Sequence, residues 1–304
     1  MCSRMLSELV KMSQTPEAQE QTVEYLGSKL KALVKPGDRA ILCFQNQKRG
    51  GLGDLYERAV RRAGGDVVLL SPDKRWKSLL QQSFFSHASL IIGPPLVILG
   101  LAKLKKHSGL PLYIRNAVLA GYLSPEWIVE GIQQGLDCKV WGTFGLGTSS
   151  VVAGFACGNG MAIHVRSDTY GIHVMDRAGS VLPQEHVGEL VLYPISAPEI
   201  RVFTGDIGRL EKTQCVCGGD ETRLMDYYPG NSEDTELAEL AQQLQSWTSV
   251  LDCRVRRSEQ GLEIELVVFP GEKLPKLPSV AKQVVRPWDP KHDEPFFFKP
   301  LPLV

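Results

Sequence analysis

The sequence predicts an α/β protein built from a parallel α/β sheet subdomain, an antiparallel β-rich subdomain and a small α+β C-terminal domain. Within residues 1–150, short apolar runs alternate five times with segments of helical periodicity. From Val151 onward that periodicity disappears, and short runs of alternating polarity are separated by turn residues. The first pattern favours a parallel sheet covered by helices, and the second favours an antiparallel barrel or sandwich. We expect parts at 1–150, 151–224 and 225–304.

The expected elements of the first part follow from apolar spacing and from stop signals. Residues 17–34 carry apolar side chains at helical intervals and end at Lys35-Pro36-Gly37-Asp38, which stops a helix. The buried strands expected next are 39–44, 67–70, 90–92, 117–119 and 139–143. The helices expected between them are 50–63, 76–85, 96–106 and one that begins at Ser124-Pro125-Glu126, with Ser124 as its cap.

The later parts are read in the same way. Strands are expected at 161–165, 171–175 and 189–193, followed in the third part by a helix over 234–247 and strands over 252–257 and 262–269. From Pro270 the chain is rich in proline and has little periodicity. We expect this tail to run extended over the surface.

Composition and charge exclude several classes of protein. The 304 residues are 43% hydrophobic and 22% charged, with a formal net charge of zero, which suits a folded protein and gives no sign of a nucleic-acid partner. The longest apolar stretch, 88–104, is interrupted by Gly93-Pro94-Pro95 and is too short to cross a bilayer. Charged residues interrupt the N-terminal segment, so it does not resemble a secretory signal. We expect a cytoplasmic protein with no membrane partner.

Seven cysteines in a cytosol are expected to remain reduced, and their clustering points to metal binding. Cys215 and Cys217 stand on a glycine knuckle, and Cys157 and His164 lie upstream. Three thiolates and one imidazole form the closed tetrahedral set that structural zinc prefers. The alternative is that Cys157 is a small buried hydrophobe, His164 a satisfied strand residue and the two later cysteines plain thiols.

Six segments carry a family resemblance. They are 34–38, Gly50-Gly51-Leu52-Gly53, 119–122, Phe144-Gly145-Leu146, 176–192 and Thr204-Gly205-Asp206. In order and approximate spacing they resemble the phenylacetate–CoA ligase branch of the adenylate-forming superfamily, over residues 25–270. The resemblance implies the fold of those enzymes and their reaction. There a carboxylate attacks the α-phosphate of ATP, pyrophosphate leaves, and a thiol such as coenzyme A displaces AMP.

The resemblance also implies site residues. Asp206 would accept the ribose hydroxyls, within a segment that includes Thr204. Phe144, followed by Gly145, occupies the place of the residue that stacks on adenine, and Gly121 that of backbone lining the base. Relatives in this branch hold zinc with cysteines and a histidine arranged as in this chain. The implied ligands are therefore ATP or AMP, a carboxylic acid and zinc, with magnesium and coenzyme A if the chain is active.

The sequence also departs from the family. Such ligases carry a Ser/Thr/Gly-rich phosphate loop upstream of the segment equivalent to 34–38, and the 33 residues before that point contain none. Lys48-Arg49-Gly50-Gly51 could serve an anion instead, but a packed turn is the simpler interpretation. The glutamate that would position magnesium is replaced within 147–150. Lys299 is the one candidate for the lysine that serves adenylation, and its alternative is a solvated lysine on the tail.

Two functions from different classes follow. One is an ATP-dependent ligase that activates an aromatic or other carboxylic acid to an acyl-adenylate and acyl-CoA. The other is a catalytically degenerate homologue that binds a nucleotide or acyl group as an assembly subunit. A third arrangement is one half of a split ligase, in which a partner protein supplies the phosphate loop. Oligomer formation is compatible with each of these.

Overall fold

The structure is a computed structural model that describes residues 2–44, 48–70, 75–121, 124–146, 150–158, 162–176, 178–228, 235–259, 261–277, 280 and 282–290. The helices are α1 (Cys2–Ser13), α2 (Pro16–Leu30), α3 (Leu52–Arg62), α4 (Trp76–Ser86), α5 (Pro95–Ser108), α6 (Glu126–Leu136) and α7 (Thr235–Ser246). Within these ranges no helix has the length and apolar character that a membrane crossing needs.

The strands form two sheets among the described residues. The larger sheet has the order β2-β1-β3-β4-β5-β6-β7-β11-β10-β9-β8, and the smaller sheet has the order β12-β13-β14. The strands of the parallel part are β1 (Arg39–Leu42), β2 (Asp66–Leu69), β3 (Leu90–Gly93), β4 (Asn116–Leu119) and β5 (Lys139–Leu146). Those that follow are β6 (Val151–Ala156), β7 (Ile163–Val165), β8 (Tyr170–Met175), β9 (Gly188–Pro194), β10 (Val202–Glu211), β11 (Arg223–Tyr228), β12 (Val250–Ser258), β13 (Gly261–Val268) and β14 (Lys282–Pro287).

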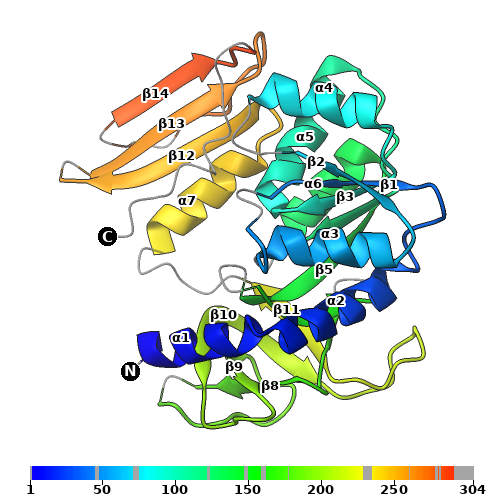
Figure 1. Cartoon of the computed structure of the whole chain (residues 1–304). Coiled ribbons are helices and arrows are strands. Elements are labelled where there is room, and N and C mark those ends of the chain that lie inside the picture. Colours follow the sequence, from blue (N-terminus) through cyan, green and yellow to red (C-terminus); the bar gives the residue numbers. More distant parts are fainter. Residues whose placement is uncertain are drawn as a thin grey trace.

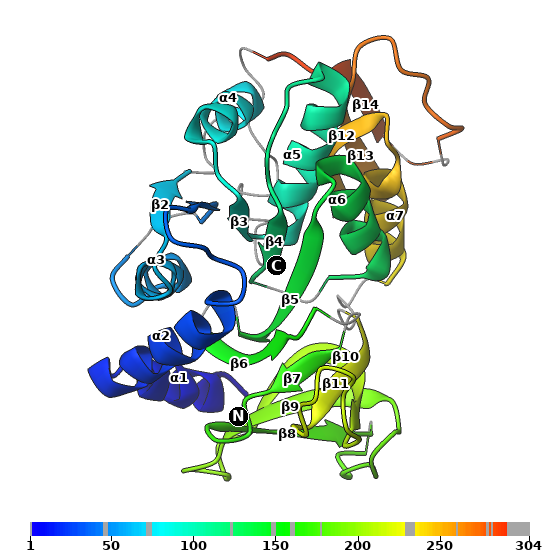
Figure 2. The ribbon, with the colours of Figure 1, turned by 90° about the vertical axis from the view of Figure 1, so that its right-hand side faces the viewer.

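The parallel half of the large sheet is covered by helices on both faces, as Figures 1 and 2 show. β2 lies on one side of β1 and β3 on the other, so the order of the strands reverses there. Because such crossovers are right-handed, the reversal places α3 on one face and α4–α6 on the other. The α2 and α3 side packs around Leu26, Leu55 and Tyr56. The expected parallel α/β sheet is confirmed, with a switch point between β1 and β3.

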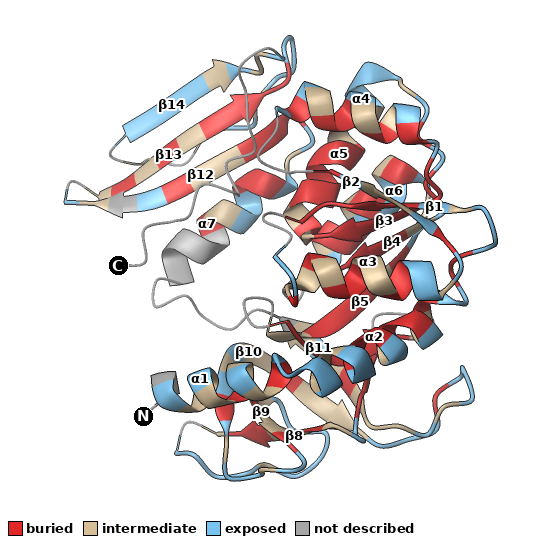
Figure 3. Ribbon diagram, viewed as in Figure 1, coloured by how far each residue is buried: buried red, intermediate tan, exposed pale blue. Residues whose placement is uncertain are grey.

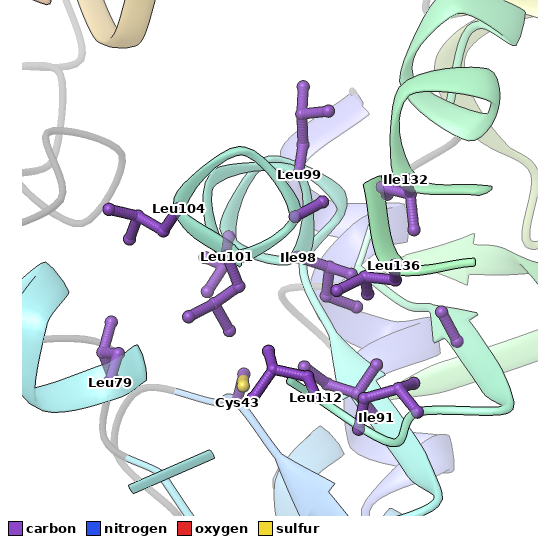
Figure 4. Close-up of a cluster of buried hydrophobic side chains, with 14 of the residues drawn as sticks. Cys43, Leu79, Ile91, Ile98, Leu99, Leu101, Leu104, Leu112, Ile132 and Leu136 are labelled. Carbon is purple, nitrogen blue, oxygen red and sulfur yellow. The ribbon is translucent and has the colours of Figure 1, made fainter. Parts of the chain in front are cut away.

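The core on the other face is centred on α5. Leu101 and Ile98 of α5 face Cys43 and Ile91 of the sheet, and Leu136 comes from α6 (Figure 4). These side chains are at most 1% exposed. α5 is buried on most sides because α4, α6 and β12 also pack against it. This burial explains why the first eight residues of the helix, Pro95–Ala102, carry no polar side chain.

β5 joins the two halves of the large sheet. Its first four residues pair with β4 in parallel, and Thr143–Leu146 pair with β6 in antiparallel fashion. β5 has eight residues where β1–β4 have four each, so its carboxyl half extends beyond β4 and is free to pair with β6. The antiparallel strands expected after Val151 are therefore present, but they continue the parallel sheet through β5.

Three local expectations need correction. Residues 2–13 form α1, an unexpected helix, which packs against β10 and contributes the buried Leu9 to the β-rich core. Helix α6 begins at Glu126 with Pro125 as its cap residue, so Ser124 is not the cap. Residues 282–287, within the tail expected to run extended from Pro270, form β14, which pairs in parallel with β13 and is mostly exposed (Figure 3).

The C-terminal unit of α7 and β12–β14 is joined to α5 by apolar packing and by Lys103. The Nζ of Lys103 donates to the carbonyl oxygens of Gln245, Trp247 and Val250 at 2.6, 3.2 and 2.8 Å. These carbonyls lie at and just after the end of α7, where backbone acceptors lack helical partners. Burial lowers the pKa of Lys103 to about 8. The lysine thus closes the end of α7 and holds it against α5.

Candidate functional site

A pocket of about 560 Å³ opens at the carboxyl ends of β1, β3 and β4. Phe44, Pro94 and Ala120 follow these strands directly and line it. The start of α3 and the junction between α1 and α2 supply the other walls. In doubly wound sheets, ligands bind outside the carboxyl ends of the strands at the switch point, which is the position of this pocket.

The turn before α3 brings two cations to the pocket. Lys48 and Arg49 line it and are exposed, and the turn is closed by a hydrogen bond from the Gly51 N–H to the Lys48 carbonyl oxygen at 2.8 Å. Gly50 adopts φ +77°, and a Cβ there would lie 2.4 Å from Gln19 Nε2 of α2. The positive φ favours glycine at this position, and the missing side chain lets Gln19 lie this close. The turn is packed, as the simpler interpretation of the sequence has it, and it also borders the pocket.

The candidates for the adenine site lie together around a smaller crevice of about 10 Å³. They are Gly121, Phe144 and Gly145, and Gly121 also lines the larger pocket. The Phe144 side chain is 1% exposed and belongs to the same core cluster as Leu9 of α1. A Cβ on Gly145 would lie 1.9 Å from the Val151 carbonyl oxygen, so close backbone packing alone demands glycine there. The crevice has room for about one water.

Thr204, Gly205 and Asp206 form an irregularity in β10, where the register with β9 shifts. Gly205 has φ +75°, the Thr204 hydroxyl donates to the Leu190 carbonyl oxygen at 3.0 Å, and the Asp206 N–H donates to that hydroxyl oxygen at 3.1 Å. Burial raises the pKa of the Asp206 carboxyl to about 7. In the sheet, β6, β7 and β11 separate β10 from β5, the strand of Phe144.

The four predicted metal ligands converge. The candidate ligand atoms of Cys157, His164, Cys215 and Cys217 all lie within 4.8 Å of one another. The Cys157 and Cys215 sulfurs are 3.7 Å apart, and His164 Nε2 is 3.5 Å from the Cys217 sulfur. With Zn–S near 2.3 Å and Zn–N near 2.0 Å, the edges of a tetrahedron are about 3.5–3.8 Å. The spacing therefore suits a closed tetrahedral metal site that joins β6, β7 and the β10–β11 loop.

Glu221 completes this cluster and was not predicted from the sequence. One carboxylate oxygen, Oε2, lies 2.9 Å from His164 Nδ1, so the opposite ring nitrogen is the one turned toward Cys217. A carboxylate on the free nitrogen of a ligating histidine fixes the tautomer and the ring orientation. The only sequence sign was an acidic residue two positions after the Gly218-Gly219 knuckle.

Cys215 of the cluster differs in pKa from three cysteines outside it. A hydrogen bond from the Cys217 backbone N–H is the main cause that lowers the pKa of Cys215 to about 6, which favours its thiolate. Burial raises the pKa of Cys43, Cys138 and Cys253 to about 12. All of these are free thiols in the structure. Cys215 is therefore a ligand-like thiol, whereas Cys43, Cys138 and Cys253 resist ionisation.

Two sequence candidates lie outside the described residues. Lys299 is one of them, and so is the stretch 147–149, where the family's magnesium-positioning glutamate is missing. Ser150, which follows that stretch, is described. It lines the pocket and has φ +61°, a sparsely populated conformation for serine.

The known proteins that this chain resembles are found among solved structures. No protein-family model matches the sequence, and no curated protein matches it. Among solved structures, a 2-hydroxyisobutyryl-CoA ligase in the postadenylation state matches with a TM-score of 0.65 and 14% identity over 82% of this chain. A benzoate CoA ligase from Burkholderia xenovorans LB400 matches with 0.54 and 13% over 88%. An amide bond synthetase from Marinactinospora thermotolerans matches with 0.50 and 13% over 87%.

This chain spans 58% of the length of the 2-hydroxyisobutyryl-CoA ligase, 62% of the benzoate CoA ligase and 61% of the amide bond synthetase. At 13–14% identity the likeness establishes the fold and not the reaction. The polypeptide has the mixed α/β fold of adenylate-forming acyl-CoA ligases, with a large sheet and a second, small sheet.

Proposed function

We propose that this protein is an adenylate-forming ligase of the phenylacetate–CoA ligase type, which binds an adenine nucleotide and a carboxylic acid and activates the acid for transfer to a thiol. One observation carries the proposal. A pocket of about 560 Å³ lies at the switch point of the large sheet, in a chain that has the fold of acyl-CoA ligases. The acid would occupy the pocket beside Gly121, and Asp206 would accept the ribose hydroxyls. Coenzyme A is the proposed acceptor, and magnesium the proposed metal of the reaction.

The proposal is tested by exchange of pyrophosphate into ATP over a panel of aryl and alkyl acids, together with calorimetric titration of AMP. Exchange that rises with one acid and is lost in Asp206→Ala is the expected result. Asp206→Asn, which keeps the size of the side chain, serves as a second variant that separates loss of the carboxylate from loss of packing. If the protein binds no nucleotide, the proposal is wrong.

A second candidate function is nucleotide or acyl binding without activation of ATP. The burial of Phe144 and the 10 Å³ crevice beside it favour the acyl-binding form of this candidate, because the crevice has no room for an adenine ring. AMP binding with no pyrophosphate exchange would support it. In that case a partner protein that restores exchange would indicate a split ligase, and addition of purified fractions to the exchange assay would identify it.

We further propose that Cys157, His164, Cys215 and Cys217 hold a structural zinc ion. The 3.7 and 3.5 Å separations and the Glu221 contact support this, and the four ligands would leave no open position for a substrate. Zinc bound there would fasten the β10–β11 loop to β6 and β7. Metal analysis of purified protein should give one zinc per chain, with loss of that zinc in Cys215→Ser. A stoichiometry well below one would refute the assignment.

A further inference from the structure

We infer that the switch-point pocket takes an acid that carries a second anionic group, either another carboxylate or a phosphoryl group, and that Lys48 and Arg49 bind this second group. The inference rests on the proposed function because it treats the pocket as the site of the acid. It goes further by assigning a substrate class and two residues for specificity. It does not depend on whether the chain activates ATP.

The first argument is the charge of the pocket. Among the described residues that line it, the charged side chains are Lys48 and Arg49, and both are positive. Gln14, Gln19 and Ser150 add further polar groups. Pockets for uncharged ring systems are lined mainly by apolar and aromatic side chains. Here Phe44 is the aromatic residue of the described lining, and its ring is stacked on Tyr56 at 5.7 Å.

The second argument is that these cations have no carboxylate partner among the described residues, whereas three arginines of α3 do. Arg58 pairs with Glu20 at 2.5 Å, Arg61 pairs with Glu57 at 3.0 Å, and Arg62 pairs with Glu20 and Glu24. The nearest carboxylate along the chain, Asp54, accepts from the Gly50 N–H at 3.0 Å and faces Arg58 at 3.6 Å. The positive charges of Lys48 and Arg49 are thus available to a ligand.

The third argument is that the wall carrying the cations is preformed. The hydrogen bond between Gly51 and Lys48 fixes the turn, and Gly50 packs directly on Gln19. The Gln19 amide in turn donates to the Gln14 carbonyl oxygen at 3.1 Å. A fixed wall places its charges before the ligand arrives, which reduces the ordering cost of binding. The backbone of α3 begins in the same wall with Gly51 as its cap residue and no side-chain cap, so it adds a small positive potential.

The test is calorimetric titration with acids matched in skeleton and different in charge. Butyrate is compared with succinate, benzoate with phthalate, and glycerate with 3-phosphoglycerate, and inorganic phosphate is titrated alone. We expect the dianionic member of one pair to bind at least about tenfold more tightly, a difference that corresponds to about 1.4 kcal/mol. Preference for succinate or phthalate indicates a second carboxylate, and preference for 3-phosphoglycerate indicates a phosphoryl group. The preference should weaken as salt is raised.

The variants are the double substitution Lys48→Gln with Arg49→Gln and the control Arg61→Gln, a cation of α3 outside the pocket lining. The double variant should lose the preference, and the control should keep it. Equal binding of both members of every pair, or a preference that survives the double substitution, would overturn the inference. AMP binding with no dianion preference would refute this inference alone, and dianion preference with no AMP binding would refute the nucleotide part of the proposed function alone.

Discussion

Glu221 Oε2 lies 2.9 Å from His164 Nδ1, and Nε2 of the same imidazole lies 3.5 Å from the Cys217 sulfur. The carboxylate thereby selects which ring nitrogen is presented to a metal. We predict that Glu221→Gln weakens zinc binding by about 10- to 100-fold, the usual effect of removing such a partner. Competition with a chromophoric chelator measures this affinity. Glu199→Gln, an exposed residue of the same subdomain, is the matched control and should leave the affinity unchanged.

Asp206 gives a pH dependence whose sign follows from its raised pKa. Burial raises the pKa of this carboxyl to about 7 from its ordinary 3.8, so between these values the folded protein holds a proton that the unfolded chain has lost. The stabilisation that this proton provides is complete below about pH 4 and is lost as pH rises through 7.

Asp206→Asn stays neutral at every pH and removes this dependence. Relative to the wild type, the variant should be more stable at pH 8 than at pH 5, by about 1–2 kcal/mol after allowance for the partial exposure of the side chain. Urea unfolding at the two pH values measures the difference. A difference that is the same at pH 5 and pH 8 would show that the carboxyl is not perturbed.

Gly145 lies where the close packing of β5 on β6 leaves no room for a side chain. Because a Cβ there would lie 1.9 Å from the Val151 carbonyl oxygen, Gly145→Ala should lower the free energy of unfolding by about 3 kcal/mol. Gly109→Ala is a suitable control, since Gly109 has φ +69° with open space around it and should cost only about 1 kcal/mol. Chemical denaturation compares them. Equal losses in the two variants would mean that the β5–β6 contact yields more easily than its geometry indicates.

Lys103 is expected to control the docking of the C-terminal unit. Lys103→Met removes a donor from three carbonyl oxygens, of which that of Trp247 keeps the Val250 N–H at 3.1 Å. The loss should cost about 1–3 kcal/mol and make residues 235–290 more sensitive to proteolysis. Limited proteolysis followed by mass spectrometry locates the cleavage sites. Lys106→Met, at an exposed position of the same helix, should leave the digestion pattern unchanged.

The strands and helices of residues 39–146 could be predicted because their apolar patterns are local and strong. Helix α1 was missed, although α3, α4 and α6 are shorter and were predicted, and it packs Leu9 into the β-rich core, a contact between distant segments. β14 was missed because proline-rich composition indicates an extended chain but not its partner. Its pairing with β13 depends on contacts between distant segments.

Some features of the candidate site could likewise be predicted from the sequence, and others could not. The convergence of Cys157, His164, Cys215 and Cys217 could be anticipated because ligand chemistry restricts which residues gather, and the bound metal itself stays a prediction. Glu221 could not be anticipated, since its role depends on the orientation of one imidazole ring. The pocket near Lys48 required the strand order, because only the reversal at β1 and β3 places that turn beside Pro94 and Gly121.

The dual pairing of β5 has a mechanical consequence. One strand carries hydrogen bonds of both sheet halves, so the ladder joins the two halves at Thr143. We therefore expect the pocket and the Cys/His cluster to open as one cooperative unit. Loosening of β6 at one end of this ladder would be transmitted to Gly145 at the other. Native-state hydrogen exchange would register removal of a metal from Cys157 as faster exchange of the β5 amides, at the wall of the crevice beside Phe144.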